Sequence, residues 1–276
     1  LIRAICDSMI MLGWGPYQND HEDANGQFEM NWDFSDCLQT ADRHVFFKFM
    51  VRTLAEKKGL RATFMPKPFL NKTGNGCHAH LSVWDKKGKN LFADKNDKLG
   101  LSKTAYNFMG GIMNSAEALT AWFNPTINSY KRINAPTTAS GATWAPNTVT
   151  RTGNNRTHMV RVPGPGRFEL RLPDGATNPY LLQAVIIAAG IHGLEINADP
   201  GKRYDIDMYA EGYKVKGAPK LPLNLLDALR IFDKDKALKE SLGVEFSNAF
   251  LKLKHEEWTS FCSHFSSWEK ENTLDI

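Results

Sequence analysis

Charged and apolar residues alternate in the segment of residues 167–172. In a β-strand Arg167, Glu169 and Arg171 share one face, because successive side chains point to opposite faces of the sheet. A solvated surface strand shows the same alternation, and for a single segment that is the commoner explanation. Two other segments repeat the arrangement, which favours a binding site.

The second segment, residues 77–84, carries His78 and His80 two positions apart. On a strand both imidazoles point the same way, which suits metal or phosphate chemistry, although a single histidine is more often structural. A loop containing Gly74 and Gly76 precedes them. Glycine allows backbone N–H groups to approach a ligand closely.

The third segment, residues 27–34, again alternates and places Glu29 on its polar face. Glu22 precedes it across a turn that contains Gly26, so the two carboxylates can approach one point. Hard divalent ions such as Mg²⁺ or Mn²⁺ favour carboxylate oxygens with an occasional imidazole. The candidate metal ligands are therefore Glu22, Glu29, His78 and Glu169.

Arginines accompany these candidate ligands, and their planar forks suit carboxylates and phosphates. Carboxylates, a divalent metal and arginines together are what phosphoryl transfer needs, since its catalysis is mainly positioning and charge neutralisation. Neither a GxxxxGK[ST] nor a GxGxxG motif occurs, which excludes the P-loop and Rossmann modes of nucleotide binding. The arginines in question are Arg132, Arg156, Arg161, Arg167 and Arg171.

Composition excludes several other classes. The 276 residues carry a net charge of +4 with the basic residues dispersed, so we expect no nucleic-acid partner. No apolar run is long enough to cross a bilayer, so no membrane association is expected. The four cysteines form no CxxC pair, which favours reduced thiols and a cytoplasmic location.

The element pattern predicts an α+β fold with a mainly antiparallel sheet and helices packed on one face. Ser35 is the expected N-cap of the second helix, and residues 13–19, 135–152 and 198–222 are expected to be loops. Because residues 1–12 form a helix already under way, we expect the chain to be the C-terminal part of a longer protein. The expected strands are 27–34, 62–65, 77–84 and 167–172, and the expected helices are 1–12, 36–58, 102–122, 180–196, 223–233 and 246–270.

At this point the sequence resembles the catalytic C-terminal domain of the glutamine synthetase family. Within that family the resemblance is strongest to the branch of type III-like enzymes and glutamate–methylamine ligases. The resemblance implies one catalytic domain over residues 1–276 and a glutamine synthetase/guanidino kinase-like fold. The matching motifs, in the family's order, are Gly26-Gln27-Phe28-Glu29, Lys67-Pro68, His78-Ala79-His80-Leu81-Ser82, Asn124 to Arg132, Asn155-Arg156, Arg161-Val162-Pro163, Arg167 to Arg171 and Asn178-Pro179-Tyr180.

The resemblance implies ATP-dependent joining of an amine to the side-chain carboxylate of L-glutamate through γ-glutamyl phosphate. It implies metal ligation, by Mg²⁺ or Mn²⁺, at Glu22, Glu29, His78 and Glu169. It implies glutamate binding at Gly74, Arg132 and Arg171. It implies catalytic roles for Arg156 and Arg161, and ATP binding at Trp32, His80, Ser82, Arg156, Arg161 and Arg167.

Two departures from the family follow from the sequence. The family's N-terminal domain, which supplies further metal-binding carboxylates, is absent from these residues. The flap loop, residues 135–152, contains no Glu or Asp, whereas ammonia-using enzymes carry a Glu there that helps bind ammonium. Trp144 lies at or near that position and suits a methylated ammonium through apolar and cation–π contact, so methylamine is the preferred amine and ammonia the alternative.

Other possibilities stay open on the sequence. They are a γ-glutamyl ligase for polyamines, a non-catalytic structural member of the family, and a guanidino kinase, which the Glu/His set disfavours. Family members assemble as stacked rings with sites between subunits. A large, dodecamer-like homo-oligomer is therefore expected of the intact chain.

Overall fold

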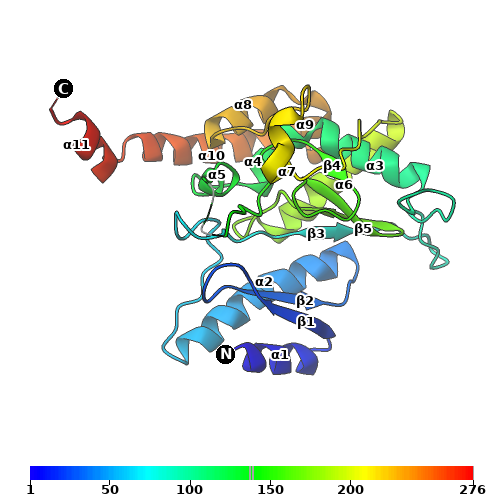
Figure 1. Ribbon diagram of the computed structural model, residues 1–276, viewed down its shortest axis with the longest axis horizontal. Coiled ribbons are helices and arrows are strands. Elements are labelled where there is room, and N and C mark those ends of the chain that lie inside the picture. The colour runs from blue at the N-terminus through cyan, green and yellow to red at the C-terminus, as the bar shows by residue number, and fades with distance from the viewer. Residues whose placement is uncertain (137, 139, 276) are drawn as a thin grey trace.

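The computed structural model describes residues 1–136, 138 and 140–275 and confirms the expected α+β class. A layer formed by α1, β1, β2 and α2 lies beneath a larger body of helices and a second sheet (Figure 1). The strands are β1 (Pro16–His21), β2 (Phe28–Trp32), β3 (Ala79–Leu81), β4 (Arg151–Thr152), β5 (Val160–Gly164) and β6 (Arg167–Leu170). The helices are α1 (Ile2–Met11), α2 (Cys37–Glu56), α3 (Lys103–Asn114), α4 (Ala116–Phe123), α5 (Ser129–Ile133), α6 (Pro179–Glu195), α7 (Met208–Glu211), α8 (Leu225–Lys234), α9 (Lys236–Leu242), α10 (Val244–Cys262) and α11 (Ser267–Thr273), with a 3₁₀ turn η1 (Gly212–Lys214).

The larger sheet has the strand order β3-β6-β5-β4, with only the β4–β5 pair parallel. Segments far apart in sequence therefore become neighbours, since His80 of β3 is opposite Glu169 of β6. Arg161 of β5 is opposite the same Glu169 from the other side. This register therefore places the carboxylate of Glu169 at the centre of the predicted polar face.

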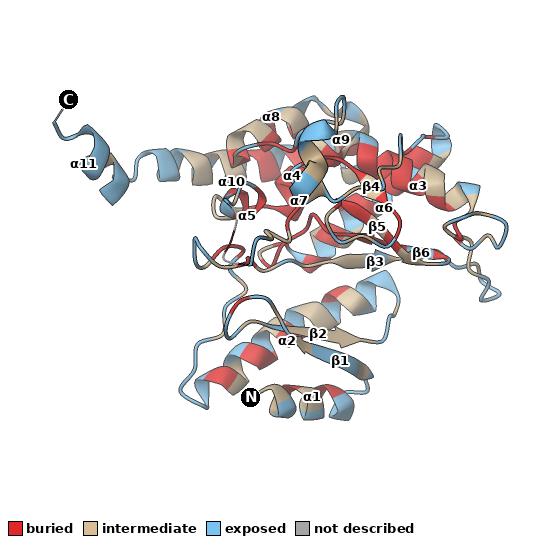
Figure 2. Cartoon of the chain, in the orientation of Figure 1, coloured by how far each residue is buried: buried red, intermediate tan, exposed pale blue. Residues whose placement is uncertain are grey.

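The apolar face of this sheet packs into the main core. Phe168, Leu170 and Leu172 are fully buried, as the alternation of residues 167–172 predicts. Buried residues gather in the upper body, between the sheet and α3, α4, α6 and α8 (Figure 2). Helices α3 and α6 cross closely because Gly111 has no side chain: a Cβ there would lie 2.0 Å from the carbonyl oxygen of Ala189.

The lower layer has a smaller core of its own. Trp14 packs against Trp32 and Phe46 with ring centroids 5.9 and 6.0 Å apart, and Phe47 lies 5.1 Å from Trp32. Lys48 of α2 ties this layer to the body by donating to the carbonyl oxygens of Gly175 and Thr177. The β1–β2 hairpin is thereby held beside the larger sheet.

Several expected elements differ from the structure. Residues 13–19, expected as loop, include most of β1, whose polar sequence hides its pairing with β2. Residues 62–65 form no strand, because they pair with no neighbouring strand and Pro66 follows at once. The N-cap of α2 is Asp36, which accepts from the Gln39 N–H, and not Ser35.

Three long stretches are also divided differently. The helix expected over 102–122 breaks at Ser115 into α3 and α4, which lets both pieces follow the core. The C-terminal helix breaks after Cys262: α10 begins against the body, where Phe250 and Leu251 are buried, and its far end and α11 extend away from it (Figure 1). The loop expected over 198–222 contains α7 and η1. Across the described ranges, no helix is both long and apolar enough to span a membrane.

Candidate active site

Glu169 is the centre of the polar face of the larger sheet. Its side chain is buried, and Arg171 Nη1 donates to its Oε1 at 2.6 Å while Arg161 Nη1 donates to its Oε2 at 2.8 Å. His78 Nδ1 lies 3.3 Å from Oε1. Two guanidinium groups therefore compensate one buried carboxylate and leave a net positive charge, which attracts anions.

His78 is kept neutral by its surroundings. Burial first, and then the guanidinium groups of Arg171 and Arg132, hold the pKa of His78 well below its usual range. Its Nε2 is buried and has no hydrogen-bond partner among the described residues. With Nδ1 facing Glu169, a neutral imidazole presents a lone pair on Nε2, as a metal ligand requires.

Glu22 and Glu29 form a second pair on the β1–β2 hairpin. The hydrogen bond that the Glu22 carboxyl group donates to Glu29, then burial, raises the pKa of Glu22 to about 7. The Glu22 carboxyl is also the main cause that lowers the pKa of Glu29, with Asn31, Arg156 and Arg171 acting in the same direction. Two adjacent carboxyl groups that share a proton are a natural place for a cation.

The predicted metal ligands thus come together as two pairs, Glu22 with Glu29 and His78 with Glu169. His80 is opposite Glu169 in the β3–β6 pairing; burial lowers the pKa of His80, and the carboxylates of Glu169 and Glu29 oppose this effect. In the part of the chain that the structure describes, no group of three or more His, Cys, Asp or Glu side chains is close enough to hold a metal. Each pair nonetheless has the oxygen and imidazole donors that Mg²⁺ or Mn²⁺ prefers, so the residues fit such an ion.

The predicted glutamate-binding residues surround the same centre. Arg132 is buried, and its guanidinium donates to the carbonyl oxygens of Leu172 and Arg171 at 2.9 and 3.2 Å. Gly74 lies beside the Arg132 side chain, and its carbonyl accepts from Gln27 Nε2 at 3.0 Å. Arg171 keeps one buried N–H, Nε, without a partner in the described chain. Arg132 therefore supports Arg171, and Arg171 retains a free donor.

The predicted ATP-binding residues fall into two groups. His80 Nδ1 lies 2.9 Å from Arg167 Nη1 across β3 and β6, and Ser82 continues the same edge. Arg156 and Arg161 line an open pocket of about 500 Å³ together with Trp144, Asn154, Asn155 and Thr157. Trp32 sits apart from both groups, packed against Trp14 and Phe47 in the lower layer.

Arg156 and Arg161 differ in how firmly hydrogen bonds hold their side chains. Arg161 is held by Glu169 and by Asn154 Oδ1, which accepts from Nε at 2.8 Å and Nη2 at 2.6 Å. Arg156 is exposed and makes no hydrogen bond within the described ranges. One arginine is therefore fixed in position, and the other is free to meet a ligand.

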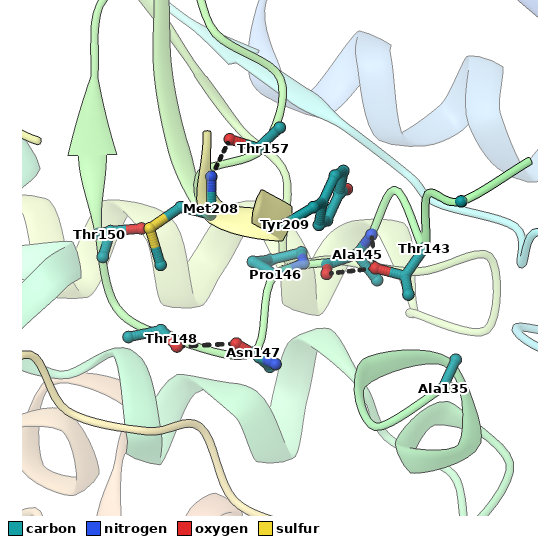
Figure 3. A pocket seen from close by; sticks show the side chains of 11 residues that line it. Ala135, Thr143, Ala145, Pro146, Asn147, Thr148, Thr150, Thr157, Met208 and Tyr209 are labelled. Carbon is teal, nitrogen blue, oxygen red and sulfur yellow. Dashed lines mark hydrogen bonds between the residues drawn. The ribbon is translucent and has the colours of Figure 1, made fainter. Parts of the chain in front are cut away.

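The flap around Trp144 closes a smaller cavity of about 230 Å³, shown in Figure 3. Trp144 adopts φ +53°, a left-handed conformation that is rare for a bulky residue, and meets Tyr209 of α7 edge-on with ring centroids 6.2 Å apart. Of the predicted flap, residues 137 and 139 lie outside the described residues. The cavity is lined by Ala135, Gly141, Thr143, Ala145, Pro146, Asn147, Thr148, Thr150, Thr157, Met208 and Tyr209.

Sequence reasoning missed two residues at this flap. Asp23 accepts hydrogen bonds from Thr73 and Ser140, joining the hairpin to the glycine loop and the flap. Tyr209 lies in α7, within residues 198–222, which the sequence predicts to be a loop that carries no chemistry. An acidic residue next to Glu22 was a visible signal for Asp23, whereas nothing local marks Tyr209.

Comparison with known proteins identifies the family of the chain. The sequence profile of the glutamine synthetase catalytic domain matches residues 1–273. The chain is 71% identical over 277 residues to glutamine synthetase of Rhizobium leguminosarum bv. phaseoli, covering 100% of this chain and 64% of that protein. It is 44% identical over 285 residues to glutamate–methylamine ligase of Methyloversatilis universalis, covering 100% and 63%.

Solved structures show the same fold. Apo GmaS without ligand superposes with a TM-score of 0.93 at 59% identity, covering 100% of this chain and 62% of that one. The GmaS/ADP complex in conformation 1 gives a TM-score of 0.94 at 62% identity, covering 100% and 63%.

The fold is an α+β fold whose larger sheet carries a buried cluster of one carboxylate and two arginines on its polar face. The chain belongs to the glutamine synthetase family, in its catalytic-domain part. It spans less than two thirds of the length of the relatives described above.

Proposed function

We propose that the protein ligates an amine to the side-chain carboxylate of L-glutamate at the expense of ATP. The observation that carries this proposal is the buried Glu169 with His78, Arg161 and Arg171 around it, beside the Glu22–Glu29 pair. Such a site combines cation ligands with excess positive charge, which suits transfer of a phosphoryl group onto a carboxylate. Relatives named glutamine synthetase and glutamate–methylamine ligase support it.

The first half of the reaction joins ATP and glutamate. An oxygen of the glutamate side-chain carboxylate attacks the γ-phosphorus of ATP, the bond to the β-phosphate oxygen breaks, and ADP leaves. Arg156 and Arg161 neutralise charge on the transferring group, and Arg161 is already held in position by Asn154 and Glu169. The ADP complex of GmaS supports a nucleotide site in this fold.

The second half consumes the γ-glutamyl phosphate. The amine nitrogen attacks the acyl carbon, the bond to phosphate breaks, and the nitrogen loses a proton. Arg171 and Arg132, with the Gly74 backbone, hold the glutamate end of the substrate. His80, Ser82 and Arg167 form the nucleotide edge, and exclusion of water protects the acyl phosphate.

A divalent ion, Mg²⁺ or Mn²⁺, would be held by Glu22 with Glu29 and by His78 with Glu169. When bound, it would supply charge neutralisation at the phosphate oxygens. The buried Nε2 of His78 and the proton shared by the two carboxyl groups are the structural features that favour a cation here.

For the amine we favour a small alkylamine, methylamine, over ammonia. Trp144 supports this choice because an aromatic face binds an alkylammonium through cation–π and apolar contact, and the 59% and 62% identity to the two GmaS structures points in the same direction. The 71% identity to a glutamine synthetase keeps ammonia as the second candidate.

We further propose that residues 1–276 form one catalytic domain and that the intact protein works in the cytoplasm as a homo-oligomer of stacked rings. Four free cysteines suit a reducing compartment. Analytical ultracentrifugation of the intact protein tests the assembly, and a monomer would contradict it.

Steady-state phosphate release by the intact protein tests the function. We expect turnover only when ATP, glutamate, an amine and Mg²⁺ or Mn²⁺ are all present, with kcat/KM higher for methylammonium than for ammonium. A higher value for ammonium would make the protein a glutamine synthetase. No glutamate-dependent turnover with any amine would favour the non-catalytic alternative.

A further inference from the structure

The turn that carries Arg156 is closed by the side chains on either side of it. Asn155 Oδ1 accepts from the Thr157 N–H at 3.0 Å and from the Thr157 hydroxyl at 2.9 Å. An asparagine side chain that binds the residue two positions further on closes a tight turn of the backbone. The Arg156 side chain is exposed and makes no hydrogen bond to the described residues, so its placement depends on the backbone of this turn.

The same turn is bound to residues 206–208, the segment that leads into α7. The Met208 N–H donates to Thr157 Oγ1 at 2.9 Å (Figure 3), and Asn155 Nδ2 donates to the carbonyl oxygen of Ile206 at 3.0 Å. His158 Nε2 lies 2.9 Å from the same carbonyl oxygen, which can only accept, so Nε2 carries the proton. Side chains before and after Arg156 therefore bind one segment from a distant part of the chain.

His158 lies too deep to meet a ligand. It is 1% exposed and does not line the open pocket that contains Arg156 and Arg161. Its Nδ1 is buried without a partner among the described residues, an arrangement that costs about 1 to 3 kcal/mol. The hydrogen bond to Ile206 is what this buried imidazole contributes, so any effect of His158 on the reaction acts through the turn.

We propose that the turn around Arg156 is held for catalysis by three positioning residues, Asn155, Thr157 and His158. Bound to residues 206–208, the turn keeps a fixed backbone, from which the guanidinium of Arg156 projects into the open pocket. This inference rests on the proposed function, in which Arg156 neutralises charge on the transferring phosphoryl group.

Arg161 shows why Arg156 depends on its neighbours. The guanidinium of Arg161 is held directly by Asn154 and Glu169, whereas that of Arg156 has no such partner in the described chain. Charges that stabilise a transition state act only from the correct place, and a displacement of about 1 Å lowers a rate by up to about a hundredfold. A looser turn should therefore reduce the contribution of Arg156 far more than that of Arg161.

A double-mutant cycle on the intact protein tests the proposal through kcat for phosphate release at saturating substrates. Thr157→Val keeps the shape of the side chain and removes its hydroxyl, and we expect it to lower kcat by about tenfold. In the Arg156→Ala background the same substitution should change the residual kcat by no more than about twofold, because the group through which Thr157 acts is gone. Thr120→Val, which removes a buried hydroxyl bound to the Ala116 carbonyl within α4, is the control and should leave kcat within about twofold of its starting value in both backgrounds.

An equal fold-loss for Thr157→Val in the two backgrounds would overturn the proposal, because it would show direct contact of Thr157 with the substrate or general damage to the fold. A loss of less than about twofold in the presence of Arg156 would overturn it as well. Should Thr157→Val not fold, Asn155→Ala at a half-buried position takes its place in the cycle, with the same two criteria. Absence of glutamate-dependent turnover in the wild-type protein would refute the proposed function and this inference together, whereas equal losses in an active enzyme contradict the positioning role alone.

Discussion

The carboxyl groups of Glu22 and Glu29 share a hydrogen bond at the end of the β1–β2 hairpin, and this contact raises the pKa of Glu22 to about 7. Like charges in this position repel each other once both are ionised. A bound cation is therefore expected to stabilise this pair by compensating the repulsion between its two carboxylates.

We expect Mn²⁺ to stabilise the wild-type protein and to lose this effect in Glu22→Gln and Glu29→Gln. At a metal concentration about one hundred times Kd, binding contributes about 2.7 kcal/mol, or a rise in Tm of roughly 5 to 10 °C. Differential scanning calorimetry with Mn²⁺ and with EDTA measures the shift. Glu56→Gln, at the exposed end of α2, is the matched control, and a full Mn²⁺ shift in both site variants would show that the ion binds elsewhere.

Glu169 is expected to be structural as well as functional. Its removal in Glu169→Ala leaves the buried Arg171 and the partly buried Arg161 without their counter-charge, which costs about 3 to 5 kcal/mol of unfolding free energy. Urea denaturation followed by fluorescence measures it. Glu195→Gln, which removes a solvent-exposed partner of His192, should cost less than about 1 kcal/mol, and a similar loss in both variants would argue against the buried cluster.

Substitutions of the two arginines that line the open pocket, Arg156 and Arg161, should affect activity and stability differently. Arg156→Ala removes an exposed side chain and is expected to lower kcat by about a hundredfold to a thousandfold while Tm stays unchanged. Arg161→Ala also breaks the contact with Glu169, so Tm falls together with activity. Thermal melts and phosphate-release rates on the same preparations decide the matter, and a fall in Tm for Arg156→Ala would show a structural role that the contacts do not reveal.

His44 is expected to make the protein less stable at acid pH. Burial, with a smaller effect of Lys48, lowers the pKa of His44 from 6.5 to about 4. Between pH 4 and pH 6.5 the unfolded chain binds more protons at His44 than the folded protein does. The contribution of the neutral His44 to the free energy of unfolding is therefore complete above pH 6.5 and is lost as the pH falls to about 4. The loss in the free energy of unfolding amounts to about 3 kcal/mol.

Urea denaturation at intervals from pH 4 to pH 8 checks this slope. His44→Gln should flatten it, whereas His264→Gln, at an exposed position near the C-terminus, should leave it intact. An unchanged slope in His44→Gln would assign the acid limit to other groups.

The sequence predicted those features that depend on local periodicity. Alternation over residues 167–172 correctly put Glu169 on the polar face and Phe168 in the core, because side chains in a strand alternate whatever surrounds it. The helices α1, α2 and α6 were predicted for the same reason, with ends displaced by one or two residues. The α+β class followed from these elements.

Tertiary structure decided what depends on contacts between distant segments. β1 is a strand because β2 pairs with it, and residues 62–65 are not because no neighbouring strand pairs with them. The division of the candidate ligands into two pairs, and the meeting of Asp23 with Ser140 117 positions away, also come from packing. A side chain's neighbours across the fold are set by register and helix crossing, which local spacing does not encode.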